Sequence, residues 1–375
     1  MATPAAVRAM APAQLFMRWI PELLGNYPVA LGQAAINIPL DMVGYLDLIM
    51  VHLKGTITTD AAITFNQLMP WNIITNFLIQ PPGQTPPFRI GGQLLHAWNL
   101  IAPDFAPFKT AFGVPYSNRG TGAGAIDPIN TTSIDVFPKA NAAGQVVHLW
   151  YVLPAHRSSM DVRGVLPLGN RTRTNLSLSI AATADLVAAA SVAHVTATAL
   201  SVDVYQCYFT PPSVDSGAAV DPYWAVTYDQ AQQVIAAVGA QAPIDIVPDD
   251  TILGIIHAVA CNNVLDSTAI DTIALQVNES WLLGQQPLPF AAWEYIQNRT
   301  HAQVLPTGFI YYDLDDSVDD GLLDVKKWLH TDRVNKIRSY ISIAAGATLG
   351  AGPAIFTSTR RLVDLNPAAH AAALG

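Results

Sequence analysis

The stretch Val195–Pro212 reads VTATALSVDVYQCYFTPP and carries the alternation that decides the fold. Apolar residues occupy odd positions as far as Ala199 and even positions from Leu200 onward, with polar side chains between them. This period of two is typical of a strand with one face on a core. The alternation slips where Ala199 and Leu200 adjoin, as it does at a β-bulge. We expect the strand to end before Pro211-Pro212, because proline cannot donate to a ladder.

The composition predicts a strand-rich protein that buries much of its surface. Of 375 residues, 51% are apolar and only 13% are charged. That balance is unusually apolar for a soluble monomer and predicts extensive contact between subunits. The formal net charge of -9 argues against direct nucleic-acid binding, because neutralising phosphates requires a basic surface. A chain of this length allows one to three domains.

The sequence carries no motif for catalysis, metal binding or a cofactor. It lacks H-E-x-x-H, a Walker loop, G-x-S-x-G and C-x-x-C. The acidic run from Asp313 to Asp324 fails the EF-hand spacing, because Asp320 stands where the turn glycine is needed. Cys207 and Cys261 cannot form a disulfide framework, so we expect both to be small buried thiols. The sequence therefore predicts no enzyme, no cofactor and no metal site.

One carboxylate, Glu294, lies between Trp293 and Tyr295 and is the place to look for a glycosidase acid. Retaining and inverting chemistry both need a second placed carboxylate, and the sequence does not point to one. These aromatics, with Trp281, keep open a carbohydrate-binding or carbohydrate-active β-sandwich as an alternative function.

Several segments outside the opening stretch have local patterns of their own. A short N-terminal helix is predicted after Pro12, and four of its residues form an apolar face. These residues are Leu15, Phe16, Trp19 and Ile20. Residues 228–239, YDQAQQVIAAVG, read as a short helix, and 287–299, PLPFAAWEYIQNR, read as a loop or short helix. Residues 72–98 read as a strand, a Pro-rich loop and a second strand that includes QLLHAW.

Short matches that recur in the same order indicate an internal duplication. Residues 149–153, LWYVL, have a counterpart in 310–314, IYYDL, which begins 161 residues later. The tetrapeptide SIAA begins at Ser179 and again at Ser342, 163 residues later. Matches at nearly one spacing predict two similar halves.

Each half is also predicted to contain a short helix between late strands. A Ser-x-x-Asp helix start occurs at Ser158 and again at Ser317, 159 residues later. A module of about 160 residues with many strands and one helix suggests an antiparallel sandwich, and the eight-stranded jelly roll is the common form without long exposed edges. The predicted fold is therefore all-β, with two tandem eight-stranded jelly rolls (a double jelly roll) and an N-terminal helix.

The duplication gives the opening stretch a place and sets the domain boundaries. It becomes the last strand of the first jelly roll, and AIFTSTRRLVDL at 354–365 becomes its counterpart in the second. We expect an N-terminal helical arm at 1–26 and a first jelly roll at 27–210. The second jelly roll with its linker is expected at 211–365, followed by a flexible tail at 366–375.

The chain resembles the double jelly-roll major capsid proteins of tectivirus-type, membrane-containing bacteriophages. The resemblance runs from about Tyr27 to Leu365 and rests on the order of several segments. These are LWYVLPAHRSSMDVRGVL, VDVYQCY followed by a Pro-containing linker and YDQAQQVI, GFIYYDL, and PAIFTSTRRLVDL. In that family a helix lies between the F and G strands of each jelly roll, where we place the starts at Ser158 and Ser317.

The resemblance implies a homotrimer whose six jelly rolls form a pseudo-hexagonal tile of an icosahedral shell around an internal membrane. It implies a virion protein, assembled in the host cytoplasm and without enzymatic activity. Its partners would be itself, neighbouring capsomers and minor vertex or cement proteins. The N-terminal helix would lie near the viral membrane or a neighbouring subunit, with a set of apolar contact residues. These residues are Leu15, Phe16, Met17, Trp19 and Ile20. A spike or vertex protein of the virion is a further alternative.

Overall fold

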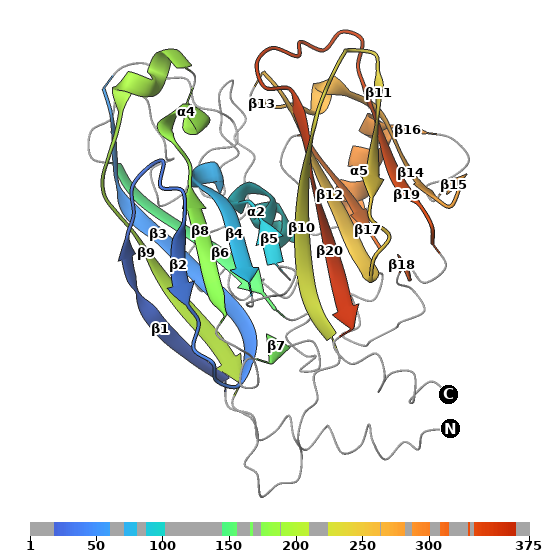
Figure 1. Ribbon diagram of the computed structural model, residues 1–375. Helices are drawn as coiled ribbons and strands as arrows, with labels where there is room; N and C mark the ends of the chain where they lie inside the picture. The colour runs from blue at the N-terminus through green and yellow to red at the C-terminus, as the bar shows by residue number, and fades with distance from the viewer. Residues whose placement is uncertain are drawn as a thin grey trace, which may run out of the picture.

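The computed structural model describes thirteen stretches of the chain. They are 19–60, 71–80, 88–101, 145–155, 166–167, 174–187, 189–209, 224–262, 264–281, 287–300, 308–314, 329–330 and 334–364. These residues form two β-sandwiches that stand side by side (Figure 1). We call residues 19–209 the first half and residues 224–364 the second half.

The first half contains two facing sheets. One has the order β1-β9-β3-β6 and the other the order β2-β8-β4-β5. The strands are β1 (Trp19–Pro28), β2 (Ile36–Pro39), β3 (Tyr45–Thr59), β4 (Ile74–Gln80), β5 (Phe88–Ile90), β6 (Gln145–Pro154), β8 (Asn175–Ile180) and β9 (Val195–Phe209), with the short β7 (Leu166–Pro167) beside β3. The helices are η1 (Trp71–Ile73), α2 (Gly92–Ile101), α4 (Thr183–Leu186) and η4 (Ala189–His194).

The second half repeats this connectivity with the orders β10-β20-β12-β17 and β11-β19-β14-β16. Its main strands are β10 (Trp224–Val234), β11 (Gln241–Ile246), β12 (Thr251–Cys261), β14 (Ile270–Val277), β16 (Leu288–Pro289), β17 (Phe309–Asp313), β19 (Ile337–Ile343) and β20 (Ala354–Asp364). Short additions are β13 (Val264–Leu265), β15 (Ser280–Trp281), β18 (Leu329–His330), η6 (Ser267–Ala269) and α5 (Phe290–Thr300). In both halves the first main strand pairs with the last, as a jelly roll requires.

The opening stretch forms β9, and its predicted phase slip is a β-bulge. In the ladder between β3 and β9, Lys54 faces Ser201 and Thr56 faces Thr198, so two residues of β9 lie opposite Gly55. One of them, Ala199, has a φ of 52°. The extra residue shifts the alternation by one position, so apolar side chains on both sides of the bulge can still face the core.

The internal repeat is a structural repeat with matching register. Ser179 and Ile180 end β8 where the β4–β8 ladder shifts register, and Ser342 and Ile343 end β19 where the β14–β19 ladder shifts in the same way. The two aromatic segments lie in the equivalent strands β6 and β17. Each SIAA copy therefore lies opposite a bulge in the neighbouring strand, which is β4 in the first half and β14 in the second.

Each half has a described helix before its aromatic strand. α2 follows β5, and α5 follows β16, so both helices come before the aromatic strands β6 and β17. The predicted starts at Ser158 and Ser317 come after those strands and lie outside the described residues. The strand predicted for QLLHAW is wrong because this segment belongs to α2, whereas the helical alternative for PLPFAAWEYIQNR is confirmed as α5.

The short helix predicted for residues 228–239 is also wrong. Residues 224–234 form β10, which pairs with β20 along its whole length. The polar residues that suggested a helix surface are used across the sheet instead. Asp229 accepts hydrogen bonds from β20, and Gln230 accepts one from the backbone N–H of Gly91. Pairing with a distant strand outweighs the local preference.

The N-terminal helix prediction fails at its last two residues. Trp19 and Ile20 begin β1, where Trp19 faces Phe209 of β9. Among the described strands β1 is an edge strand, so Pro21 can lie in it without removing a ladder bond from a central position. The sandwich of the first half therefore begins at residue 19 and not at 27. Leu15, Phe16 and Met17 lie outside the described residues.

Each half has its own apolar core. The core of the first half continues into the contact with the second half, and the second core lies between the two sheets of the second half. The described residues contain no helix with the length and apolar character needed to span a membrane. β1 and β10 begin, and β9 and β20 end, at the lower end of the molecule in Figure 1.

Candidate functional site

The described histidine and cysteines with shifted pKa values are all buried. The described residues contain no set of three or more His, Cys, Asp or Glu side chains that could hold a metal ion. His257 is fully buried beside Thr357, with 2.8 Å between Nδ1 and Oγ1, and burial lowers its pKa to about 3. Cys207 and Cys261 are free and buried as predicted. Burial raises the pKa of Cys207 to about 12, so this thiol is not a nucleophile at neutral pH.

The aromatics around Glu294 lie in three different environments. Trp293 packs toward the second core against Tyr312, with ring centroids 5.6 Å apart. Tyr295 is 69% exposed. Trp281, on the strand β15, packs against Tyr340 of β19. They do not form one stacking surface for a sugar ring. No observation therefore favours the carbohydrate alternative.

A hollow of about 170 Å³ lies at the turn between β10 and β11. Apolar and glutamine side chains line it, without a charged group. Ligand sites are usually at least about 300 Å³ and carry a few convergent polar groups. This hollow is a surface depression and not a substrate site.

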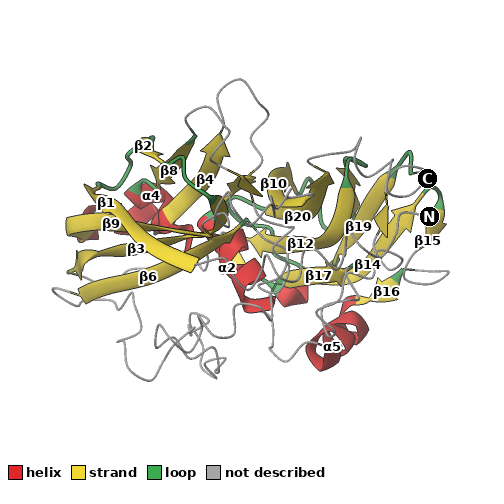
Figure 2. Cartoon of the chain, turned by 90° about the horizontal axis from the view of Figure 1, so that it is seen from below, coloured by secondary structure: helices red, strands yellow, loops and turns green. Residues whose placement is uncertain are grey.

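The most closely packed contact surface of this molecule lies between its two halves. α2 belongs to the first half and packs against β12 of the second half (Figure 2). Trp98 on α2 is 2% exposed, and its indole Nε1 donates to Ser358 Oγ on β20 over 3.0 Å. Its ring lies edge-on to Tyr228 of β10 and Tyr311 of β17, at 5.8 and 5.6 Å. α2 thus contacts all four strands on the outer face of the β10-β20-β12-β17 sheet.

Close backbone approach accompanies this contact. A Cβ added to Gly254 of β12 would lie 3.1 Å from the Trp98 ring, and one added to Gly92 would lie 2.4 Å from the carbonyl oxygen of Trp71. β5 also pairs in parallel with β10, where Phe88 faces Tyr228. The β2-β8-β4-β5 sheet of the first half and the β10-β20-β12-β17 sheet of the second half therefore form one continuous sheet, which has ten strands with β13 and β18 included.

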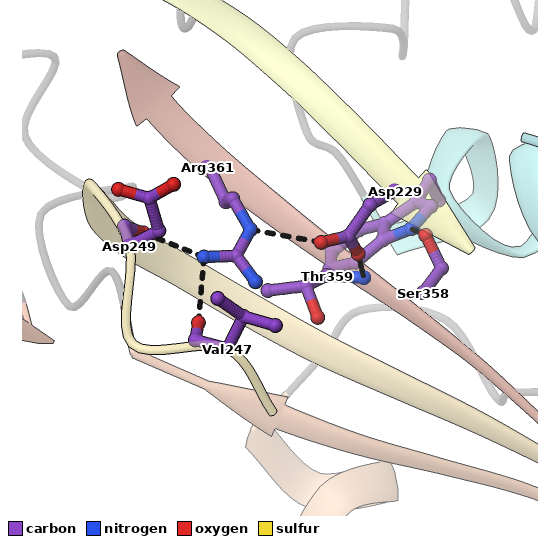
Figure 3. Close-up of polar contacts among 7 residues, drawn as sticks. Asp229, Val247, Asp249, Ser358, Thr359 and Arg361 are labelled. Carbon is purple, nitrogen blue, oxygen red and sulfur yellow. Dashed lines mark hydrogen bonds and ion pairs between the residues drawn. The ribbon is translucent and has the colours of Figure 1, made fainter. Parts of the chain in front are cut away.

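A buried arginine fixes the lower end of the second half. Arg361 Nε donates to Asp229 Oδ2 over 2.9 Å, and its Nη1 donates to the carbonyl oxygens of Val247 and Asp249. Figure 3 shows the guanidinium between Asp229 on one side and the turn that carries Val247 and Asp249 on the other. The Arg361 side chain is only 7% exposed. Its role is to hold the turn between β11 and β12 against the sheet.

The outer face of the β1-β9-β3-β6 sheet is apolar where a solvated sheet would be polar. Leu48, Met50, Val152 and Cys207 form a buried cluster there, separate from the core on the inner face. Trp150 and Tyr205 pack against it. Sheets that are apolar on both faces are normally covered on both faces. This face is therefore the second candidate contact surface.

A charged cluster borders this outer face. Asp203 accepts hydrogen bonds from Lys54 Nζ at 2.5 Å and Asn26 Nδ2 at 2.6 Å, and His52 Nδ1 lies 3.6 Å from the same carboxylate. The His52 ring stacks on Trp150 with centroids 4.1 Å apart. Burial disfavours the charged form of Asp203, but its hydrogen bonds to Lys54 and Asn26 together lower its pKa below the usual value.

The lowered pKa predicts an acid-dependent contribution to stability. The pKa of Asp203 is lower in the folded protein than in the unfolded chain. Ionised Asp203 therefore stabilises the folded protein at pH values above the unfolded pKa, and this contribution is lost as the pH falls through the folded pKa. We expect Asp203→Asn to lower the free energy of unfolding by about 1–3 kcal/mol at pH 7. Urea unfolding from pH 7 to pH 2.5 should show this difference shrinking below about pH 4. A difference that stays constant with pH would contradict the assignment.

The contact residues predicted from the sequence differ from the residues that the structure places at the contact between the halves. Trp19 and Ile20 lie in β1, beside the outer face, and Leu15, Phe16 and Met17 remain untested. The interface residue Trp98 was missed, although the apolar residues Leu94, Leu95 and Ala97 beside it in α2 were a local signal of burial. The run LIMVHL in β3 was the corresponding signal for a sheet covered on both faces.

The comparisons with known proteins identify the fold. No family model matches the sequence, and no curated protein sequence matches it. The crystal structure of the STIV MCP matches with a TM-score of 0.65 at 11% identity, covering 94% of this chain and 99% of that chain. The PBCV-1 virus capsid structure matches with a TM-score of 0.61 at 9% identity, covering 92% and 93%. The major capsid protein P2 of bacteriophage PM2 matches with a TM-score of 0.52 at 12% identity, covering 93% and 99%.

These matches span both halves, so the shared feature is the tandem arrangement and not a single jelly roll. The chain has the all-β double jelly-roll fold, as predicted from its internal repeat. At about one residue in ten identical, the likeness establishes the fold alone.

Proposed function

We propose that the protein is the major capsid protein of an icosahedral virus with an internal membrane, and that it assembles as pseudo-hexagonal homotrimers. Support comes from the fold, which this chain shares over more than nine tenths of its length with structures described as major capsid proteins or virus capsids.

The observation that carries the proposal is the contact between the two halves. It is heterologous, because α2 and β5 of the first half meet β10 and the outer sheet face of the second half. The equivalent surfaces are α5 and β16 of the second half, and β1 with the outer face of the first half. Among the described residues, these surfaces make no such contact with each other. Repeating a heterologous contact closes a ring when the rotation allows it. Three copies would then supply a ring of six similar sandwiches.

The same geometry gives the tile an inner side. Because β1 and β10 begin and β9 and β20 end at one end of the molecule, residues 1–18 are attached at that end (Figure 1). We assign this end to the virion interior, where Leu15, Phe16 and Met17 would contact the membrane or a neighbouring subunit. Trp19 and Ile20 then form the junction between this arm and β1.

The oligomeric state of the purified protein tests this proposal. We expect light scattering to give three times the chain mass of 40.1 kDa, or larger shells, and electron microscopy to show hexagonal tiles. A protein that stays monomeric at micromolar concentration would overturn the proposal. Densitometry of virions separates a shell protein from a spike, because a spike is present in few copies.

A further inference from the structure

The two helices that follow the fifth main strand of each half are buried to very different extents. In α2, every residue from Gly92 to Asn99 except Gln93 is buried. In α5, Ala291 and Ala292 are exposed and Tyr295 is 69% exposed. Figure 2 shows the reason: α2 lies between the two halves, whereas α5 lies at the lower edge of the second half, near β16. α5 therefore presents an apolar face without a described neighbour.

The contacts of α2 show what such a helix binds in this fold. Trp98 lies across three strands of one outer sheet face, reaching Tyr228 on β10, Ser358 on β20 and Tyr311 on β17. In chain order these are the first, last and sixth main strands of the second half. The receiving surface is therefore defined by strand position as well as by apolar character.

The first half has the same three strands, and their outer face carries apolar side chains that are partly exposed. The strands are β1, β9 and β6, and the residues are Leu23, Tyr205 and Trp150. Leu23 faces Tyr205 directly in the ladder, so both side chains are on one face. Trp150 lies 5.9 Å from Tyr205 between ring centroids. We call Leu23, Trp150 and Tyr205 the outer patch.

The outer patch is incompletely covered. Leu23 is 53% exposed, and Trp150 and Tyr205 are each partly exposed. The patch is continuous with the buried cluster beneath it, which contains Met50 and Val152. By contrast, Tyr228 and Tyr311 on the equivalent face of the second half are 3% and 5% exposed, because α2 covers them.

We infer that α5 of one copy of this chain packs on the outer patch of the next copy, with Tyr295 in the role that Trp98 has within the chain. This inference rests on the proposed trimer and assigns its contact to particular residues. Two exposed apolar groups, Tyr295 and Leu23, are explained together, because each belongs to one side of the same heterologous contact. Aromatic side chains at the centre of such contacts supply much of the binding energy.

Point substitutions test the contribution of Tyr295. Tyr295→Asp places a charge in the contact, and we expect it to raise the trimer dissociation constant at least about tenfold. Val234→Asp is the matched control, because Val234 is also on the second half and is 68% exposed but lies outside the contact. Light scattering over a dilution series compares both variants with the parent chain. Equal effects of the two substitutions would overturn the inference.

Disulfide trapping tests the geometry without requiring weaker assembly. The double variant Leu23→Cys with Tyr295→Cys is expected to form covalent dimers and trimers on mild oxidation, and neither single variant should do so. Val234→Cys with Tyr295→Cys is the control pair, and the two native thiols are buried. If the parent is trimeric and the first pair does not cross-link, the α5 contact is wrong while the capsid proposal stands. If the parent is monomeric, the capsid proposal itself fails.

Discussion

Replacing Trp98 by alanine is expected to lower the free energy of unfolding by about 3–5 kcal/mol, as truncation of a buried aromatic usually does. Trp98 is 2% exposed and is among the largest fully buried side chains of the described residues. The change removes the indole hydrogen bond to Ser358 and the edge contacts to Tyr228 and Tyr311. It also leaves a cavity between α2 and the outer sheet face of the second half.

Urea unfolding at a fixed protein concentration measures this loss, since concentration affects the apparent stability of an oligomer. Trp281→Ala is the matched control. Trp281 is 36% exposed and contacts Tyr340 at the edge of the second half. Its removal should cost at most about 1 kcal/mol, the value of one aromatic pair with partial burial. A Trp98 variant as stable as the Trp281 variant would show that the packing of α2 does not stabilise the contact between the halves.

The features predicted correctly from the sequence are those with local and repeated signals. The alternation in β9 predicted both a strand and its bulge, because a period of two and its phase can be read within one strand. The SIAA repeat predicted the duplication, and its two copies lie at equivalent register shifts. From the duplication, the double jelly roll followed without knowledge of any pairing.

The wrong predictions share a different cause. β10 has a helix-like pattern, yet it pairs with β20, more than a hundred residues away in the chain. QLLHAW has the apolar run of a buried strand, yet it forms α2 because its all-round burial comes from two halves at once. β1 is held by β9 across a similar separation. In each segment a distant partner decides the structure, and no local window contains that partner.

Identifying the candidate contact surfaces also required knowledge of which distant segments lie together. Trp98 and Tyr295 are ordinary helix aromatics in the sequence, and their roles appear only when equivalent strands of the two halves are compared. The apolar runs in β3 and α2 could have indicated covered surfaces. They could not indicate which surface covers which, because that depends on the relative placement of the halves.

Substituting Gly55 is expected to show how strictly the β9 bulge is built into the fold. Gly55 has a φ of 156°, and a Cβ placed there would lie 2.5 Å from Leu200 Cδ2 and 2.8 Å from Leu200 Cα. Gly55→Ala therefore combines backbone strain of about 1–3 kcal/mol with overpacking of about 1–3 kcal/mol. Urea unfolding should reveal a loss of roughly 2–6 kcal/mol in stability.

Gly346→Ala provides the control for this substitution. Gly346 lies in the turn after β19, its added Cβ meets nothing within 4 Å, and its φ is outside the positive region. We expect its effect to stay within about 0.5 kcal/mol. If Gly55→Ala is equally mild, β9 can slide past Gly55 and the bulge is not fixed by sterics. If it is severe, close packing of Leu200 against Gly55 fixes the register on which both faces of the β1-β9-β3-β6 sheet depend, including the outer patch that carries Tyr205.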